Sequence, residues 1–336
     1  MKFLLRAVTI FAGALLLHPK NQAAEPPPLI NITPTAFSPQ TTFFIPGVFQ
    51  LVETTNTIVS RPPSDLPREM AHVPLGIPIY VVAHLGINND QWAQAQTAEN
   101  NTSIPATNAL KMIGSSATLI PVDKAVRWSF NSASLPPQLK AEVPGGGIYF
   151  HIEDRLPQPA TPFLFADQNQ ALLVEAKLRM PQMTQQGSAT TTVSLGVGMQ
   201  TLDTTGKLAP LPLIVGLFNS RAYTREVVGF DGRNLYAGSP LTPKASFIVP
   251  IAGQQQSGAW NGPMIFSFKI DRPTITRLIT AINKARLQHG LVPLDTHLSS
   301  VRLKALDLRN ENRFLDKGTI QVMLDTEYLR ATRLSN

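Results

Sequence analysis

The sequence predicts a mainly β protein, an antiparallel β-sandwich with one amphipathic helix near residues 273–288. Apolar residues recur at every second position in several short segments, and turn-forming residues separate these segments. No alternation of strands with helices is visible, which argues against a parallel α/β fold. The chain has 336 residues and no cysteine, so a hydrophobic core must stabilise it without disulfide bonds.

The clearest strand-like segments lie in the second half of the chain. A period of two turns one set of side chains toward a core and the other toward solvent. The apolar members of five such segments are Leu172, Val174, Ala176, Leu178 and Met180; Val193, Leu195, Val197 and Met199; Phe266, Phe268 and Ile270; Val301, Leu303 and Ala305; and Ile320, Val322 and Leu324. Gly196 and Gly198 fall opposite the apolar face of their segment, and Gly216 lies on another. Glycines there allow close approach either of a ligand in a shallow groove or of a covering loop.

One segment has helical instead of strand spacing. Its apolar residues are Ile275, Leu278, Ile279 and Ile282. Asp271 is a suitable N-cap, Pro273 fits the first turn, and Gly290 is a typical stop. We expect this helix to seal one open end of the sandwich core.

The chain divides into four predicted segments. Residues 1–24 combine a basic start, an apolar run and small residues at the end, which is typical of a signal peptide. Residues 25–42 are rich in proline and are predicted to be an extended linker without a strand. Residues 43–137 form a β-rich segment, either a separate small domain or the outer strands of the sandwich, and residues 138–336 form the sandwich. We therefore expect a secreted or periplasmic protein with no transmembrane segment after signal removal.

The charge balance argues against a nucleic-acid partner. The chain has 29 Lys+Arg and 22 Asp+Glu, and the predicted signal peptide holds three of the basic residues and no acid. The remaining net charge of +4 is spread along the chain, whereas nucleic-acid binding requires a basic patch or stripe.

Catalytic motifs are scarce. Nucleotide-binding loops, the GxSxG turn and the HExxH zinc motif are all missing from the sequence. His151 and Glu153 lie two apart on a predicted strand and share a face, and Glu175 lies on the polar face of another strand. These three are weak catalytic candidates, with a polar solvent face as the alternative. The histidines do not have metal-ligand spacing, so no metal and no cofactor is predicted.

Aromatic and polar residues suited to ligand binding gather between Phe218 and Tyr236. The candidates there are Arg221, Tyr223, Asp231 and Tyr236, because rings pack on sugar CH groups while polar groups bind hydroxyls. Trp260, in the segment 253–262, is a second candidate platform. Surface ion pairs would equally explain the arginine-rich segment, and core packing would explain Trp260.

The alternation over residues 140–336 resembles, in architecture alone, jelly-roll and concanavalin-A-like carbohydrate-binding sandwiches. This resemblance implies an extracytoplasmic module that binds a polysaccharide, glycan or envelope polymer, and no specific residue motif accompanies it. Without a complete catalytic set, binding is favoured over catalysis. Two alternatives stay open. One is a polysaccharide hydrolase with a cross-strand carboxylate pair such as Glu153 and Glu175. The other is a non-catalytic envelope, adhesion or assembly protein with a protein partner.

Overall fold

A computed structural model describes most of the chain from residue 117 onward and short stretches before it. The described residues are 26–33, 42–44, 49–52, 57–60, 79–86, 103–105, 117–134, 147–156, 162–219, 225–231, 234–313 and 318–335. Only the backbone is described for the stretches between residues 42 and 105 and for residues 117–121, 147–155, 231, 234 and 313. The predicted signal peptide and the polar segment 90–99 lie outside the described residues.

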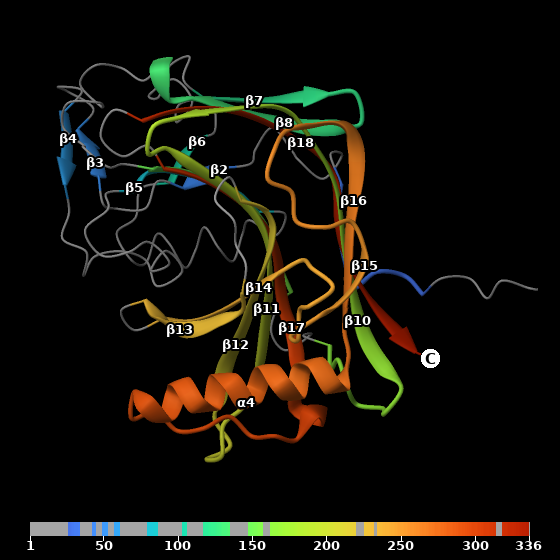
Figure 1. The fold of residues 1–336 in the computed structure, drawn as a ribbon. Coiled ribbons are helices and arrows are strands. Elements are labelled where there is room, and N and C mark those ends of the chain that lie inside the picture. Colours follow the sequence, from blue (N-terminus) through green and yellow to red (C-terminus); the bar gives the residue numbers. More distant parts are fainter. Residues whose placement is uncertain are drawn as a thin grey trace, which may run out of the picture.

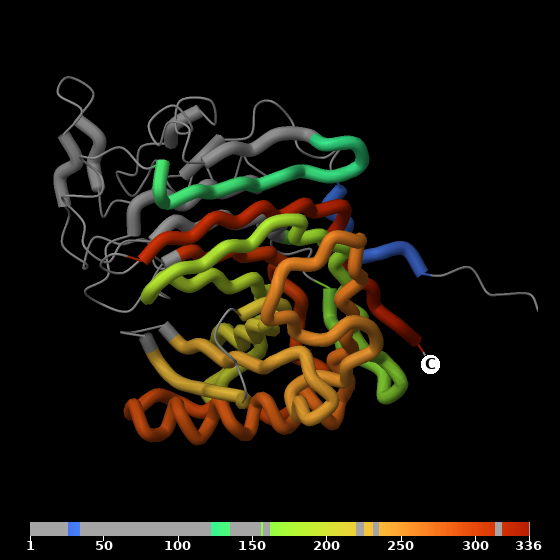
Figure 2. Tube along the Cα trace, turned by 45° about the horizontal axis from the view of Figure 1, so that its top comes forward, coloured from blue at the N-terminus to red at the C-terminus, as the bar shows by residue number. Residues whose placement is uncertain are grey.

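Within the described residues, two seven-stranded sheets form the fold (Figure 1), which confirms the predicted β-sandwich. In the first sheet, β10 (Gln170–Gln186), β18 (Thr319–Ser335) and β8 (Ala125–Asn131) run side by side (Figure 2). The order of this sheet is β15 (Val249–Ala252), β16 (Trp260–Ile270), β10 (Gln170–Gln186), β18 (Thr319–Ser335), β8 (Ala125–Asn131) and β7 (Ala117–Val122), and β1 (Ile30–Ile32) also pairs with β18.

The second sheet contains the strands that carry the candidate site described below. Its order is β13 (Val227–Asp231), β14 (Asn234–Pro240), β12 (Leu208–Asn219), β11 (Thr190–Leu202), β17 (Arg302–Arg313), β9 (Gly147–Arg155) and β5 (Ile79–Gly86). Two small sheets pair β2 (Thr42–Phe44) with β6 (Ser103–Pro105) and β3 (Phe49–Val52) with β4 (Thr57–Ser60). Short 3₁₀ turns are η5 (Ser132–Ser134) and η6 (Leu298–Ser300).

A single apolar core lies between the two large sheets. The inward residues of β10 and β11 are almost fully buried, which confirms the predicted alternation in both strands. The sheets meet where Phe218 of β12 contacts Trp260 of β16, with ring centroids 5.9 Å apart. Each sheet therefore has one dry face and one outer face.

The helix α4 (Arg272–Gln288) lies across one end of the sandwich, as expected (Figure 1). Asp271 is its N-cap in a reciprocal capping box with Thr274, and Pro273 lies in the first turn. Gly290 ends it with φ +68°, a conformation that glycine adopts without strain. The predicted apolar face of the helix is buried against the core. In the described part of the chain, no helix has the length and apolar character needed to cross a membrane.

The structure corrects the predicted alternation in β17. Leu303 faces the core, but a β-bulge follows it. On β11, Gly198 pairs with Ala305 and the next residue, Met199, already pairs with Leu303, so β17 has one extra residue at this point. Ala305 therefore lies on the outer face together with Lys304, and the core positions continue at Leu306, which is fully buried. The sequence pattern placed Ala305 on the core face because it assumed an unbroken period of two.

Two further expectations were incomplete. β12 pairs with β14, and β5 with β9, in parallel instead of antiparallel orientation. The predicted linker contains a strand, since Ile30 and Ile32 are buried and β1 pairs with β18. The proline-rich composition of the segment misled the prediction, because Ile30–Ile32 itself contains no proline. β5, β7 and β8, from the predicted segment 43–137, pair within the two large sheets.

An exposed strand edge is protected by proline. β14 pairs with β12 only over Ile214–Gly216, so among the described residues Leu208–Leu213 forms an edge on that side. Pro210 and Pro212 lie in this stretch. Because proline has no N–H, the edge offers fewer donors to another strand, which opposes sheet-to-sheet association.

A buried carboxylate joins three strands of the first sheet. Asp325 of β18 accepts hydrogen bonds from Arg127 of β8, at 2.6 and 2.9 Å, and from Arg179 of β10, at 2.8 and 2.5 Å. Its exposed fraction is 1%. Burial acts to raise the pKa of Asp325, but the hydrogen bonds from both arginines outweigh it and hold the pKa below its usual range.

We expect Asp325→Asn to lower the free energy of unfolding at pH 7 by about 2–4 kcal/mol, because it leaves two guanidinium groups facing each other. Since the pKa of Asp325 is lowered in the folded state, its stabilisation is present above the unfolded pKa of about 4 and is lost as pH falls through the folded value. Urea denaturation from pH 7 to 2 should therefore show a flatter pH dependence for the variant. The control is Glu327→Gln, which removes the half-exposed ion pair with Lys177 and should cost about 0–1 kcal/mol. Equal losses in the two variants would contradict this account.

Candidate functional site

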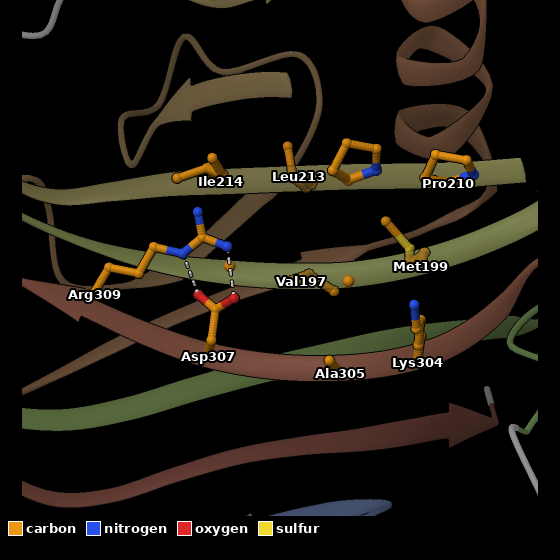
Figure 3. Close-up of a pocket in the computed structure, with 12 residues that line it drawn as sticks. Val197, Met199, Pro210, Leu213, Ile214, Lys304, Ala305, Asp307 and Arg309 are labelled. Carbon is orange, nitrogen blue, oxygen red and sulfur yellow. Dashed lines mark hydrogen bonds and ion pairs between the residues drawn. The ribbon is translucent and has the colours of Figure 1, made fainter. Parts of the chain in front are cut away.

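A groove crosses the outer face of the second sheet over β12, β11 and β17 (Figure 3). The residues of these strands that face away from the core line it. They are Pro210, Pro212, Ile214, Gly196, Gly198, Lys304, Ala305, Asp307 and Arg309. The pairing of β12, β11 and β17 aligns these positions in rows, so Ile214, Gly196 and Asp307 lie side by side across the sheet.

The floor of the groove depends on small residues. A Cβ atom at Gly196 would lie 2.1 Å from Oδ1 of Asp307, and one at Gly198 would lie 3.2 Å from Cβ of Ala305. A contact of 2.1 Å is a hard overlap, so only glycine at position 196 leaves room for the carboxylate. Glycines on this face were predicted from the sequence, and the structure identifies Asp307 as the group that fills the space above Gly196.

Asp307 and Arg309 form a fixed ion pair above β11 (Figure 3). Nε and Nη2 of Arg309 donate to the two carboxylate oxygens of Asp307, each at 2.8 Å. The side chains are 6% and 16% exposed, so the pair is mostly withdrawn from water. This bidentate geometry holds both groups in one orientation and presents a preorganised polar surface.

The side of the groove along β12 is apolar. Pro210, Pro212 and Ile214 project from alternate positions of β12 onto the outer face and are partly or fully exposed. Proline rings are rigid, so ordering them against a ligand costs little side-chain entropy. The groove thus combines an apolar side, a floor without side chains and a fixed polar pair.

The size of the groove favours an extended ligand. Its volume is about 150 Å³, which is smaller than the roughly 300–1,000 Å³ of typical small-molecule pockets. A small molecule would therefore be only partly covered. A polymer lying across the sheet would instead place one section in the groove and contact the surrounding face with the rest.

Two predicted catalytic candidates lie next to this groove by register. His151 and Glu153 are on β9, where His151 pairs with Arg309 and Glu153 pairs with Asp307. Both therefore belong to the outer face of the second sheet. Glu175 is on β10 in the first sheet, where its Oε2 accepts a hydrogen bond from Nε of Arg330 at 2.5 Å. The structure does not bring Glu153 and Glu175 together.

The structure places the predicted aromatic platform Trp260 in the core. Trp260 is 8% exposed, its Nε1 donates to the carbonyl oxygen of Leu178 at 3.3 Å, and it contacts Phe218 and Phe266. It therefore closes the sandwich and cannot serve as a surface platform. Tyr236 of β14 is half-buried and lies against Gly229, where an added Cβ atom would meet the tyrosine hydroxyl at 3.0 Å.

The described residues of the segment between Phe218 and Tyr236 lie mostly in β12, β13 and β14. Arg221 and Tyr223 lie outside the described residues, and Asp231 ends β13, so their binding roles stay predictions. Glu226 from this segment is structural. It accepts hydrogen bonds from the backbone N–H groups of Ser246 and Phe247 at 2.5 and 2.8 Å, and also from the Ser239 and Ser246 hydroxyls.

In a second hollow near the start of α4, the charged lining residues already contact the surrounding loops. Its lining includes Arg272, Arg277 and His297. Arg272 donates to the carbonyl oxygen of Phe165 at 3.0 Å, Arg277 donates to a backbone carbonyl at 2.7 Å, and the His297 ring contacts Asp295 at 2.7 Å. These interactions fix loops around the helix. Among the described side chains, no three His, Asp or Glu residues gather as a metal site would require.

Comparisons with known proteins give little further information. No protein-family model and no curated protein sequence matches the chain. Among solved structures, the family 11 xylanase from Neocallimastix patriciarum aligns with a TM-score of 0.29 and 10% identity, over 65% of this chain and 85% of that chain. A loop-swap mutant of Xyn11A from the same organism aligns with a TM-score of 0.26 and 11% identity, over 66% and 97%. Similarity at this level identifies neither a function nor a site.

Several residues of the groove were not predicted from the sequence, namely Lys304, Asp307, Arg309 and the two prolines. The signal in the sequence was the order Leu306-Asp307-Leu308-Arg309, in which two charged residues alternate with two leucines. Such an order predicts two charges on one outer face. It does not reveal that the opposite position on the neighbouring strand is a glycine.

We expect Gly196→Ala to lower the free energy of unfolding by about 1–3 kcal/mol, because the added methyl group forces Asp307 and Arg309 to move. The control is Gly258→Ala, where an added Cβ has no neighbour within 4 Å and the change should stay within about 0.5 kcal/mol. Guanidinium denaturation of both variants measures the difference. Equal stability of the two variants would show that the floor of the groove can relax.

Proposed function

We propose that this chain is an exported protein that binds an extended carbohydrate or another envelope polymer along the outer face of the second sheet. The groove over Gly196 and Gly198, with Ile214 on one side and the Asp307–Arg309 pair above, is the observation that carries this proposal. The predicted signal peptide supports export, and the small open groove suits a section of a polymer better than an enclosed metabolite.

The chemistry of the groove supports a polyhydroxyl ligand. A sugar ring has CH-rich faces that can pack on Pro210, Pro212 and Ile214, and peripheral hydroxyls that can bond to polar groups beside them. The groove lies on the outer face of a sheet, so a polymer bound in it would also contact the neighbouring strands. Affinity would then accumulate along the contact.

We expect Ile214→Ser to weaken polymer binding about tenfold, because it removes roughly 1.5 kcal/mol of apolar contact. Ile265→Ser is the matched control, since Ile265 is an isoleucine 43% exposed on the first sheet. Affinity electrophoresis and pull-down with xylan, cellulose, chitin, polygalacturonate and peptidoglycan provide the measurement. The proposal is lost if none of these polymers binds, or if both variants bind as the original chain does.

A polysaccharide hydrolase is the second candidate, and one observation favours it. Glu153 pairs with Asp307 across β9 and β17, and opposed residues of antiparallel strands have Cβ atoms about 4.5–5.5 Å apart. Glycoside hydrolysis uses two carboxyl groups at roughly 5–9.5 Å. This pair replaces the predicted pair of Glu153 and Glu175. The bidentate bond to Arg309 restrains Asp307, which favours binding over proton transfer.

Reducing-end assays on the same polymers separate the two candidates. The binding proposal predicts no release of sugars by the original chain. If sugars are released, Glu153→Gln should abolish turnover while Glu175→Gln keeps it, because Glu175 lies on the other sheet. Full turnover in Glu153→Gln would exclude the pair as the catalytic groups.

A further inference from the structure

Basic side chains follow β17 along the outer face of the second sheet. Arg302 of β17 pairs with Gln200 of β11, and Gln200 pairs with Pro210 of β12. This row of residues lies next to the row that contains Gly198. The bulge of β17 places both Lys304 and Ala305 on this face. Arg309 follows further along the strand. Without the bulge, Lys304 and Arg309 would face opposite sides of the sheet.

These positively charged side chains differ in whether a carboxylate neutralises them. Arg309 is neutralised by its bidentate bond to Asp307. Lys304 is exposed, and its ammonium group has no ion pair within the described part of the chain. The Arg302 guanidinium stacks 4.1 Å from the centre of the Phe163 ring. Its Nε is buried and has no hydrogen-bond partner among the described residues.

The Nε atom of Arg302 is itself buried, but the residue is partly exposed and carries a full positive charge that no carboxylate among the described residues balances. Phe163 holds the guanidinium in place, so this charge is already oriented on the face. Lys304, two residues away and thus roughly 7 Å along the strand, adds a mobile second charge.

We propose that the polymer bound on this face is acidic and that Arg302 and Lys304 bind its carboxylate groups. This inference rests on the proposed function and names the class of ligand. Guanidinium and ammonium groups both pair with carboxylates. The adjacent apolar side of Pro210 and Pro212 favours a polymer with sugar rings, such as a polyuronate, over a polyanion without rings.

The test uses the purified chain with three soluble probes. Polygalacturonate supplies rings and charges, its methyl ester supplies the same rings without charge, and polyglutamate supplies charges without rings. Titration calorimetry at low and high salt should show polygalacturonate binding at least about tenfold more tightly than either other probe. Higher salt should weaken this binding, because it screens exposed charges.

Variants then assign the effect to these residues. Lys304→Gln and Arg302→Gln should each weaken polygalacturonate binding about five- to tenfold and leave binding of the ester unchanged. Lys124→Gln is the matched control, because Lys124 is an exposed lysine at the turn between β7 and β8. Lys304 is exposed, so Lys304→Gln keeps the test valid even if thermal unfolding shows that Arg302→Gln destabilises the fold.

Each remaining outcome has one meaning. Equal binding of polygalacturonate and its ester would overturn the inference, as would equally tight binding of polyglutamate or losses in Lys304→Gln no larger than in Lys124→Gln. If neutral xylan or cellulose binds but polygalacturonate does not, the inference fails while the proposed function stands. If no polymer binds, both fail.

Discussion

The one-residue bulge in β17 is the constraint on which both faces of the second sheet depend. With an unbroken period of two, Leu303 would share the core face with Ala305, Asp307 and Arg309. That arrangement would bury a charged pair in the apolar core, at a cost of several kcal/mol. The bulge shifts the phase, so Leu306 and Leu308 enter the core and Asp307 moves to the outer face. Lys304 follows the inward Leu303 and faces outward in either case, so the shift brings Asp307 and Arg309 onto the face that Lys304 already occupies.

The parts of the fold that were predictable from the sequence are those determined by local pattern. The N-cap Asp271, the first-turn proline and the stop Gly290 define α4 from neighbouring residues alone, and the structure reproduces each of them. β10 and β11 follow the same logic, because their apolar residues alternate without interruption. Even the two-sheet architecture follows, since strands with one apolar face must cover one another.

The features that escaped prediction depend on partners far away in the chain. Trp260 became a core residue because Phe218 and Phe266 flank it and Leu178 accepts its N–H. Phe218 and Leu178 are distant from Trp260 in the chain, so the sequence left a surface platform and core packing as alternatives. Glu175 carries the same chemical group as Glu153 but belongs to the other sheet. The bulge in β17 likewise appears only when the strand is aligned with β11, since a lysine followed by alanine and leucine is not distinctive by itself.

The floor and one side of the groove are built from residues that have little conformational freedom. A flat outer face normally carries long side chains that lose rotamer freedom when a ligand covers them. Here glycine and alanine form the floor, prolines form one side, and the Asp307–Arg309 pair is already held by two hydrogen bonds. Little conformational freedom remains to be lost, so a ligand that covered this face would cost little side-chain entropy. The same small and rigid residues that let the strands pack closely would thus also lower the entropic cost of the proposed binding.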